Sequence, residues 1–467
     1  MARDKDRISV TEATRPSLHA ANHAAGGPNP ERRMSLRYGF NEINGWWHLS
    51  EGPYGEEIRR RHRLMGTRLV RIFVFDPQVP DPFRDWRSFG ACVQAILDAG
   101  AVPMITFARF APPFDSPANI GTFVARCREI VWSSIEQWGG DRVRDWFWCV
   151  WNEPNNPIIG GGLTYEQYHR IYIDVARRIH ELLAPHLGGR KALIGGPAID
   201  GNHRTYWMDW IARLVDDVDD HLLGFVSWHR YGDWRPAVPS RSLGLEMWGS
   251  PDAPLGTTLE ALLMAQLPTY EGRSRGVARL LKGRDILNIC GELNTISHHE
   301  NYYTLGLNQN MLGAAFYISA LIHLIRGGAD AEMRWTATAH GEDAYGLISM
   351  QGAPMPPALA KQIFAQHVRF GDLLRFPPTR PDYPEIDMLV AGHEDGQLSA
   401  VFVNTSRRPI ALKTAAWDGG LGACDEVLRL DMGTGGRVVR APFDGDVRLE
   451  GYGIAIVTNR AAATIID

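Results

Sequence analysis

The stretch DWFWCVWNEPNNP (residues 145–157) joins a short apolar run to an abrupt polar end. The run does not alternate polar and apolar residues, which is typical of a parallel strand that is buried on both faces. Asn152 and Glu153 follow the run directly, so an acidic side chain stands at the C-terminal end of a buried strand. In α/β proteins this end of the strands carries the functional groups. The stretch therefore predicts a fold class and a candidate functional residue together.

Seven further segments of the same kind occur along the chain. Each is a short apolar run that ends in polar residues, and they begin near residues 35, 67, 101, 191, 222, 285 and 331. With the run at 145 they make eight strands. Eight buried strands that alternate with helices predict a closed (β/α)₈ TIM barrel.

Helical periodicity separates these strands. Apolar residues within 89–97 recur at helical spacing, and Gly100 then supplies a C-terminal stop. Thr164 and Gln167 form a capping-box pattern before a second amphipathic helix. A third helical pattern covers about 307–327. The barrel, which we expect to be the catalytic domain, is predicted to span residues 34–375.

The two ends of the chain have a different pattern. After about residue 375, short alternating runs are separated by Gly, Asp and Asn, which predicts an all-β, sandwich-like accessory domain over residues 376–467 that packs against the barrel. Residues 1–33 are polar and lack apolar periodicity. We expect them to form a flexible N-terminal tail.

Composition excludes several functional classes. The 467 residues carry a formal net charge of −4, which offers no basic field for nucleic acid or an anionic membrane and suits a neutral ligand. The chain has no run of eighteen apolar residues and its start lacks a signal-peptide pattern, so we expect a cytoplasmic protein. Five scattered cysteines without a C-x-x-C pair indicate neither a disulfide framework nor a zinc site. The oligomeric state stays open.

A second acid follows the seventh predicted strand. Glu292 in CGELNT takes the place there that Glu153 takes after the fourth strand, and strands 4 and 7 of an eight-stranded barrel face each other across its mouth. Two carboxyl groups are what glycoside hydrolysis requires, and a separation of roughly 5 to 5.5 Å gives retention whereas a wider one gives inversion. One strand-end glutamate alone would more commonly be a solvated or salt-bridged loop residue. The pairing favours a functional site.

Several longer segments resemble a known enzyme family. They are VWNEPNNP, IGGPAIDGNHRTYWMDWI, FVSWHRYG, CGELNT with AAFYISALI, and GLISMQGAPMPPALAKQIF, and they cover about residues 145–365. In this order they resemble glycoside hydrolase family 39 of clan A, which includes β-xylosidases and α-L-iduronidases. Strands 1 to 3 match more weakly.

The resemblance implies a retaining O-glycoside hydrolase, β-xylosidase-like, that acts on oligo- or polysaccharides by double displacement. It implies that Glu153 is the general acid/base and Glu292 the nucleophile. The chain shows no dinucleotide fingerprint and no Walker A loop, so we expect neither a cofactor nor a metal. The positions implied to bind the sugar or to support the acids are Asn152, Arg71, His229, Tyr231 and Trp335.

Some of these positions have an equally plain structural explanation. Arg71 could keep the nucleophile ionised as a fixed cation, or it could belong to a buried scaffold salt bridge. His229 also fits a core histidine, and Tyr231 fits an ordinary loop tyrosine as well as a hydrogen-bond partner of the nucleophile. Trp335 fits a sugar platform or a core residue. Phe73 and Val74 replace the histidine-glycine pair of family xylosidases, which puts the identity of the sugar in question but not the catalytic pair.

Other functions stay open at the level of sequence. An endo-acting polysaccharide hydrolase of the same clan would have the same catalytic pair, and a non-catalytic carbohydrate-binding barrel would keep the aromatic residues but lose one acid. GRSRG at 272–276 matches a serine-hydrolase pattern with Ser274 as nucleophile, but no buried strand precedes it. SHHE at 297–300 suggests a metal site, although adjacent histidines point in divergent directions. We interpret both as chance matches.

Overall fold

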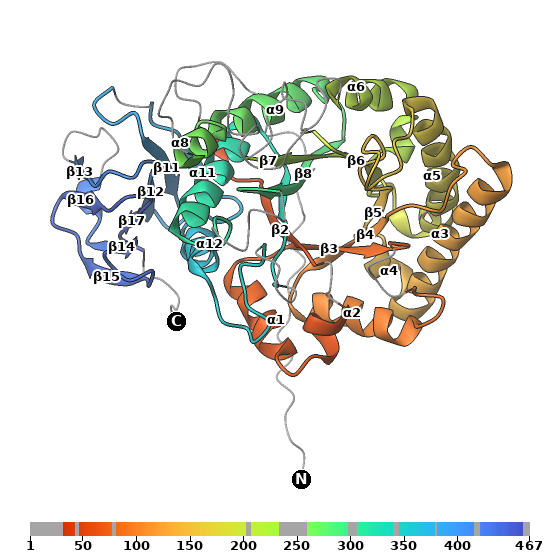
Figure 1. The fold of residues 1–467 in the computed structure, drawn as a ribbon, viewed down its shortest axis with the longest axis horizontal. Helices are drawn as coiled ribbons and strands as arrows, with labels where there is room; N and C mark the ends of the chain where they lie inside the picture. The colour runs from red at the N-terminus through yellow and green to blue at the C-terminus, as the bar shows by residue number, and fades with distance from the viewer. Residues whose placement is uncertain are drawn as a thin grey trace, which may run out of the picture.

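The computed structural model describes residues 31–42, 46–76, 81–201, 207–232, 259–297, 306–339, 345–378, 381–414 and 421–460. Eight parallel strands close into a barrel, which confirms the predicted fold (Figure 1). In barrel order the strands are β2 (Arg37–Asn41), β3 (Leu69–Val74), β4 (Val102–Phe107), β5 (Phe147–Val150), β6 (Ile194–Ile199), β7 (Phe225–Tyr231), β8 (Leu287–Asn294) and β9 (Ala331–Arg334). The fourth and seventh barrel strands are therefore β5 and β8.

Helices follow the strands and surround the barrel (Figure 1). The predicted capping box is present, because Thr164 Oγ1 accepts from Gln167 N and Gln167 Oε1 accepts from Thr164 N. The helices are α1 (Gly55–Leu64), α2 (Trp86–Asp98), α3 (Pro117–Trp138), α4 (Gly140–Val143), α5 (Tyr165–Leu187), α6 (Trp207–Asp217), α8 (Leu259–Met264), α9 (Leu267–Leu280), α11 (Met311–Gly327) and α12 (Pro356–His367), with short η1 (Trp46–Glu51), η2 (Asp220–Leu222) and η5 (Leu421–Ala423).

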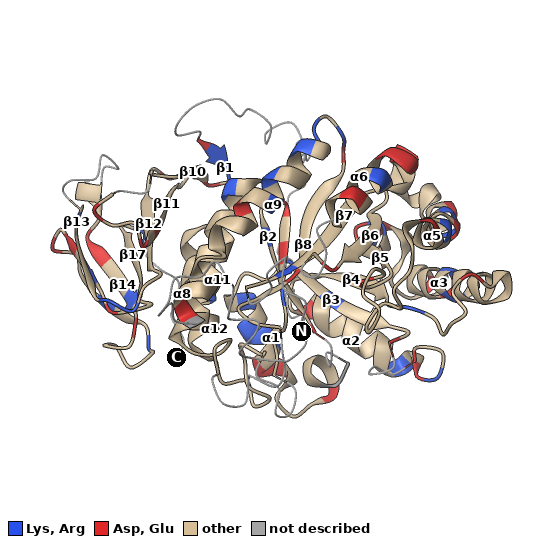
Figure 2. Cartoon of the chain, turned by 45° about the horizontal axis from the view of Figure 1, so that its top comes forward, with Lys and Arg blue, Asp and Glu red and all other residues tan. Residues whose placement is uncertain are grey.

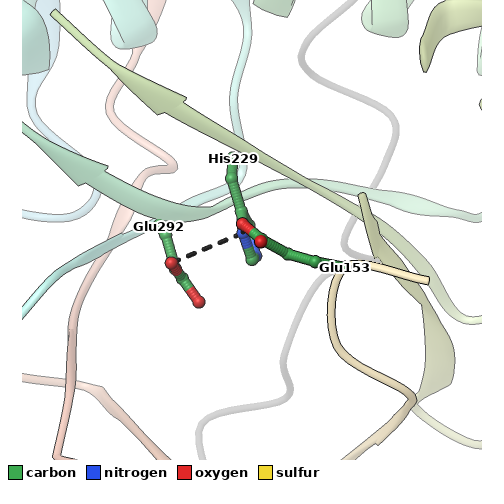
Figure 3. A group of neighbouring side chains, drawn as sticks. All are labelled: Glu153, His229 and Glu292. Carbon is green, nitrogen blue, oxygen red and sulfur yellow. Dashed lines mark hydrogen bonds and ion pairs between the residues drawn. The ribbon is translucent and has the colours of Figure 1, made fainter. Parts of the chain in front are cut away.

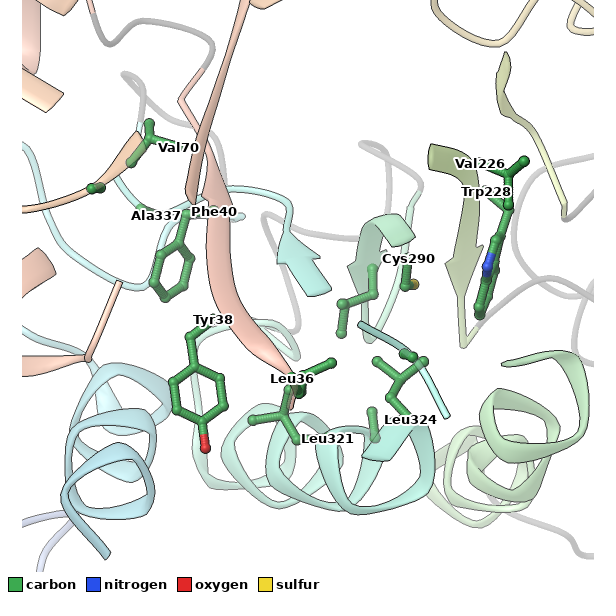
Figure 4. Packing of buried hydrophobic residues seen from close by; sticks show 14 of the residues in the cluster. Leu36, Tyr38, Phe40, Val70, Val226, Trp228, Cys290, Leu321, Leu324 and Ala337 are labelled. Atoms are coloured by element: carbon green, nitrogen blue, oxygen red, sulfur yellow. The ribbon is translucent and has the colours of Figure 1, made fainter. Parts of the chain in front are cut away.

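The barrel strands are buried on both faces, which explains their continuous apolar sequences. On the outer face, Phe40 and Trp228 belong to the same packed cluster as Leu321 and Leu324 of α11 (Figure 4). The other face carries a separate cluster that fills the barrel interior with residues such as Met104, Phe147, Phe225, Ile289 and Met333. Near the C-terminal ends of the strands, buried polar side chains such as Arg71, His229 and Glu292 lie together.

An antiparallel sheet forms the C-terminal part of the fold, as predicted. Its order is β1 (Arg32–Arg33), β10 (Leu373–Arg375), β11 (Ile386–Gly392), β12 (Leu398–Asn404), β17 (Ile454–Thr458), β14 (Glu426–Leu430) and β15 (Val439–Pro442), with β13 (Ile410–Lys413) and β16 (Asp446–Leu449) as a second pair. The sheet thus includes Arg32–Arg33 from the expected tail and Leu373–Arg375 from the expected barrel.

The two faces of this sheet bury different surfaces. Leu389 and Val401 lie on the face that shares the barrel core, next to α11 and α12 (Figure 1). Met388 and Phe402, one residue along each strand, belong to a second cluster that includes Leu412 from β13. Because successive strand residues point to opposite faces, the sheet covers the flank of the barrel with one face and builds a sandwich-like layer with the other.

The outer surface carries charges of both signs. Lys and Arg occur beside Asp and Glu along α5 and α6 (Figure 2), in keeping with the small net charge of the chain. Within the described part of the chain, no helix combines the length and the apolar character needed to cross a bilayer.

His323 of α11 ties the barrel to the sheet through two carboxylates. Its Nδ1 lies 3.3 Å from Glu271 Oε2 of α9, and its Nε2 lies 3.3 Å from Asp387 Oδ2 of β11. Burial alone would lower the pKa of His323, but the hydrogen bonds to Asp387 and Glu271 outweigh burial and raise it. A cationic His323 therefore stabilises the contact.

We expect His323→Gln to lower the free energy of unfolding by about 2 kcal/mol at acidic pH, the scale of a hydrogen bond to a charged group. Because the pKa of His323 is raised on folding, its contribution is fully present below the ordinary histidine pKa of about 6.5 and is lost as the pH rises through the folded value. Thermal unfolding of wild type and variant at about pH 5.5 and about pH 8.5 measures this. Replacing exposed His221 is the control, and a difference that does not shrink with pH would contradict the interpretation.

Candidate active site

The acidic turn after β5 is held by both neighbouring strands. The backbone N–H groups of Trp151, Asn152 and Glu153 donate to carbonyls at the ends of β4 and β6 over 2.9 to 3.0 Å. Trp151 and Glu153 have φ values of 74° and 48°, a region that non-glycine residues rarely adopt and that costs of order 1–3 kcal/mol each. The three backbone bonds and the fully buried Trp151 ring stabilise this conformation. The turn thereby fixes Glu153 at the rim of the barrel.

A bulge in β8 places the second acid. The register between β7 and β8 shifts at Gly291, so that His229 pairs directly with Glu292. One extra residue in a strand turns the following side chain to the other face of the sheet. A Cβ atom on Gly291 would lie 2.2 Å from Ser227 Oγ, so a larger residue here would displace the Ser227 hydroxyl.

Glu153, His229 and Glu292 converge from three strands (Figure 3). His229 Nδ1 lies 2.7 Å from Glu153 Oε1 and 3.4 Å from Glu292 Oε2. One carboxylate oxygen of Glu153, one of Glu292 and one ring nitrogen of His229 all lie within 4.8 Å of one another. A short distance between the two carboxylates fits the roughly 5 to 5.5 Å of retaining enzymes and not the roughly 6.5 to 9.5 Å of inverting ones.

Glu292 is held in place through both of its oxygens. Arg71 Nη1 donates to Oε1 over 2.8 Å, and the Tyr231 hydroxyl donates to Oε2 over 2.7 Å. Burial and the Glu292 charge raise the pKa of Tyr231 well above its usual value, so the hydroxyl keeps its proton. Burial also raises the pKa of Glu292, against the opposing effects of His229 and Arg71.

Arg71 connects the two halves of the site. It is fully buried, and its Nη2 donates to Asn152 Oδ1 over 2.7 Å while its Nε donates to Thr106 Oγ1 over 2.8 Å. Asn41 Oδ1 accepts from Nη1 over 3.2 Å. Neither Thr106 nor Asn41 was predicted from sequence. Their only signal was a polar residue near the C-terminal end of an otherwise apolar strand.

His229 is a neutral hydrogen-bond partner in this site. Its imidazole is fully buried, and burial is the main cause that lowers the pKa of His229 to about 4. Glu292 raises this pKa and Arg71 lowers it further. At neutral pH the ring therefore contacts both carboxyl groups without adding a positive charge.

Trp335 lies at the edge of the site beside an unexpected aromatic residue. Its half-buried ring meets Phe73 edge to face, with centroids 5.8 Å apart. Phe73 is buried and lies under the Arg71 guanidinium at 4.5 Å. Phe73 thus puts an apolar ring next to the arginine that holds Glu292.

Two other constellations do not form open sites. Ser274 lies inside α9, fully buried, and not at a strand-to-helix turn. Ser399 Oγ lies 3.0 Å from His393 Nε2, whose ring Nδ1 lies 3.0 Å from Asp372 Oδ1, in the order of a serine-hydrolase triad. Ser399 is completely buried and also contacts Thr458 Oγ1 at 2.9 Å, so no substrate reaches its hydroxyl. Residues 298–300 of the SHHE segment lie outside the described residues.

The carboxylate oxygens of Glu153 and Glu292 and the ring nitrogen of His229 are atoms of the kind that bind a divalent cation. Arg71 already places a positive charge 2.8 Å from Glu292, and a second cation there would be repelled. The arrangement therefore fits a pair of acids better than a metal centre.

Comparisons with known proteins show similarity in sequence and in fold. No family model matches the chain. A curated β-xylosidase from Geobacillus stearothermophilus is 32% identical over 206 residues, which cover 43% of this chain and 38% of that relative. The chain thus matches about two fifths of the length of that curated relative.

Solved structures show the same fold at lower identity. A monomeric β-xylosidase from Caulobacter crescentus superposes with a TM-score of 0.60 and 17% identity, covering 91% of this chain and 95% of that one. A family 39 glycoside hydrolase from Xanthomonas axonopodis gives a TM-score of 0.60 and 15% identity over 94% and 97%. The chain resembles family 39 of clan A in sequence and in fold.

Proposed function

We propose that this protein is a retaining O-glycoside hydrolase of the β-xylosidase type. The observation that carries the proposal is the convergence of Glu153 and Glu292 around His229, at a distance suited to double displacement. The name of the curated relative supports a xyloside as the substrate. Family xylosidases have a histidine where this chain has Phe73, so the identity of the sugar has to be determined by experiment.

In the first step, a Glu292 carboxylate oxygen attacks the anomeric carbon while Glu153 gives its proton to the departing glycosidic oxygen. A covalent glycosyl-enzyme forms and the aglycone leaves. Arg71 and Tyr231 orient the attacking carboxylate, since they hold one oxygen each. Asn152, which Arg71 fixes through its Oδ1, keeps its amide N–H groups for a sugar hydroxyl.

In the second step, Glu153 is a carboxylate and accepts a proton from water. The water oxygen attacks the anomeric carbon, the bond to Glu292 breaks, and the sugar leaves with its original configuration. Neutral His229 lies against Glu153 in both steps without a change in its own charge. Glu153 thus gives a proton to the leaving oxygen and takes one from water, while Glu292 forms and then releases the covalent bond to the sugar.

The acidic side of the pH profile follows from the nucleophile. Glu292 attacks only when ionised, and burial raises its pKa above the ordinary value of about 4.3. Activity should therefore fall, as the pH is lowered, at a higher pH than an exposed glutamate would give.

A panel of nitrophenyl glycosides tests the proposal. We expect the xyloside to be hydrolysed, and glucoside, galactoside, arabinoside and mannoside show how Phe73 affects the choice of sugar. Proton NMR of the first-formed product should show the anomeric configuration of the substrate. Xylan compared with the small glycoside separates endo from exo action. Inversion, or no hydrolysis of any glycoside, would overturn the proposal.

Replacing Glu153 with glutamine should affect poor and good leaving groups differently. For a phenyl glycoside, whose oxygen needs a proton, kcat/KM is expected to fall about 10²- to 10⁴-fold. For a dinitrophenyl glycoside, whose leaving group needs no acid, the first step should be nearly unchanged. Equal losses with both substrates would contradict the assignment. Dialysis against EDTA should leave both rates unchanged.

We also propose a cytoplasmic location and a carbohydrate as the only class of ligand. The five cysteines are free and buried, which is usual in a reducing compartment.

A further inference from the structure

Asn156, three residues after the proposed acid/base, lies between two carboxyl groups. Its Nδ2 is 2.9 Å from Glu153 Oε2 and 3.3 Å from Asp200 Oδ2. Asn156 is 8% exposed, Glu153 5% and Asp200 1%. At such burial, two carboxyl groups repel each other strongly unless a donor lies between them. The single amide group of Asn156 supplies that donor.

The orientation of this amide is determined by its surroundings. Asn156 Oδ1 accepts the backbone N–H of Ile158 over 3.0 Å and that of Ile159 over 3.2 Å. An amide oxygen that accepts two backbone donors must turn its NH₂ group to the opposite side. The turn formed by residues 156–159 therefore aims the donor at Glu153.

Asp200 is fixed to the same turn by the neighbouring asparagine. Asn155 Nδ2 donates to Asp200 O over 2.9 Å, and Asp200 N donates to Asn155 Oδ1 over 3.1 Å. The end of β6 and the acidic turn are thereby clamped together. These bonds hold the Asp200 backbone, and its carboxyl group lies beside Asn156.

We propose that Asn156 is a positioning residue for proton transfer, an inference that rests on the proposed function. It holds Glu153 through Oε2, so that Oε1 is left to deliver the proton and to take it back. Oε1 is the oxygen that shares His229 Nδ1 with the nucleophile Glu292, and it therefore faces the reacting bond. Asp200 opposes the ionisation of Glu153 from behind Asn156.

The charged and titratable groups around Glu153 come from four barrel strands or from the residue directly after one. They are Arg71 from β3, Asp200 directly after β6, His229 and Tyr231 from β7, and Glu292 from β8. Arg273 of α9 donates to Gly201 O and stands near Asp200. The carboxyl group of Asp200 is a charged partner of Asn156 on the side away from the reaction.

Two opposite shifts of the alkaline limb of kcat/KM follow. Asn156→Leu removes a hydrogen-bond donor that favours the ionised acid, so Glu153 should keep its proton to higher pH. The alkaline limb of the profile should then move to higher pH. Asp200→Asn removes a negative charge, so Glu153 should lose its proton at lower pH and the alkaline limb should move to lower pH. With a phenyl glycoside, Asn156→Leu should also lower kcat/KM about 10-fold, less than a complete loss of acid catalysis. A dinitrophenyl glycoside should show little change.

A second variant separates positioning from folding. Asn156→Asp keeps an oxygen for the Ile158 and Ile159 N–H groups and hence keeps the turn, but it places an acceptor against Glu153. It should move the alkaline limb to higher pH by at least as much as Asn156→Leu does. Gln167→Leu is the control, because it breaks the capping box of α5, which follows the same turn, without touching Glu153, Asn156 or Asp200. It should lower the melting temperature and leave the leaving-group dependence as in wild type.

A direct measurement does not depend on activity. In protein carrying ¹³C at the glutamate carboxyl carbons, the Glu153 signal is identified by its loss in Glu153→Gln. Its titration should move to higher pH in Asn156→Leu and Asn156→Asp and to lower pH in Asp200→Asn. An unchanged titration and an unchanged alkaline limb, in variants of an active wild type, would overturn this inference alone. A wild type that hydrolyses no glycoside would overturn the proposed function and this inference with it.

Discussion

Replacing Glu292 with glutamine is expected to lower kcat about 10⁴-fold, which corresponds to about 5.5 kcal/mol of transition-state stabilisation. An amide cannot form the glycosyl ester, so the double displacement has no first step. Glutamine retains the shape of the side chain, its amide oxygen can accept from Arg71 and its NH₂ group can donate to the Tyr231 hydroxyl oxygen, so the fold should survive. Hydrolysis of the best aryl glycoside measures the loss. Mass spectrometry of wild type treated with a 2-deoxy-2-fluoro glycoside should find the sugar on the peptide that contains Glu292.

Glu42 offers a matched control for this variant. It is another buried glutamate at the C-terminal end of a barrel strand, and its Oε1 contacts His62 Nε2 at 3.0 Å and Thr338 Oγ1 at 2.7 Å. Glu42→Gln should lower the melting temperature and keep kcat within a few-fold of wild type. Wild-type turnover by Glu292→Gln, or a label on another residue, would require a different nucleophile.

Arg71→Met should produce the second large effect, a fall of about 10²- to 10³-fold in kcat/KM at neutral pH. The pKa of Glu292, already raised by burial, should rise further once the cation 2.8 Å away is removed. Because only ionised Glu292 attacks, the acidic limb of the pH profile should then move to higher pH. Breaking a buried pair also costs about 3–5 kcal/mol of stability, which protonation of Glu292 partly offsets.

Profiles of kcat/KM against pH and thermal unfolding test this result together. Arg71→Lys should be intermediate, since lysine keeps the charge but cannot reach Glu292, Asn152 and Thr106 at once. Arg126→Met removes the more exposed pair with Asp81 and should change stability by less than about 1 kcal/mol. An acidic limb that stays in place in Arg71→Met would show that Arg71 does not keep the nucleophile ionised.

The strands and helices could be predicted because local sequence carries their signal. Each barrel strand is buried on both faces, and burial on both faces requires a continuous apolar run such as that of β5. The capping box at Thr164 and the helical spacing around α2 are likewise set within a few neighbouring residues. The acid after β5 and the acid near the end of β8 were predicted for the same reason, because a polar residue at the end of an apolar run is visible in one dimension.

The supporting contacts needed the folded chain. Thr106 and Asn41 hold Arg71 only because three strands align at one height, and nothing near either residue in sequence indicates that alignment. Asn156 lies inside the very stretch that predicted the site, but its partner Asp200 is 44 residues away. The strand at Arg32–Arg33 pairs with residues more than three hundred positions later, so a tail was the natural local interpretation.

By itself the sequence determined the order of strands and helices, the barrel class and the presence of an acid near the C-terminal ends of two facing strands. Each of these depends on hydrophobic burial and short-range hydrogen bonding. The tertiary structure alone decided that the bulge at Gly291 turns Glu292 toward His229, and that one arginine and one asparagine hold the two acids in different ways. The reason is physical: register and bulges are set by contacts between distant strands, and the protonation of a buried carboxyl group depends on whichever charges those contacts bring within a few ångströms.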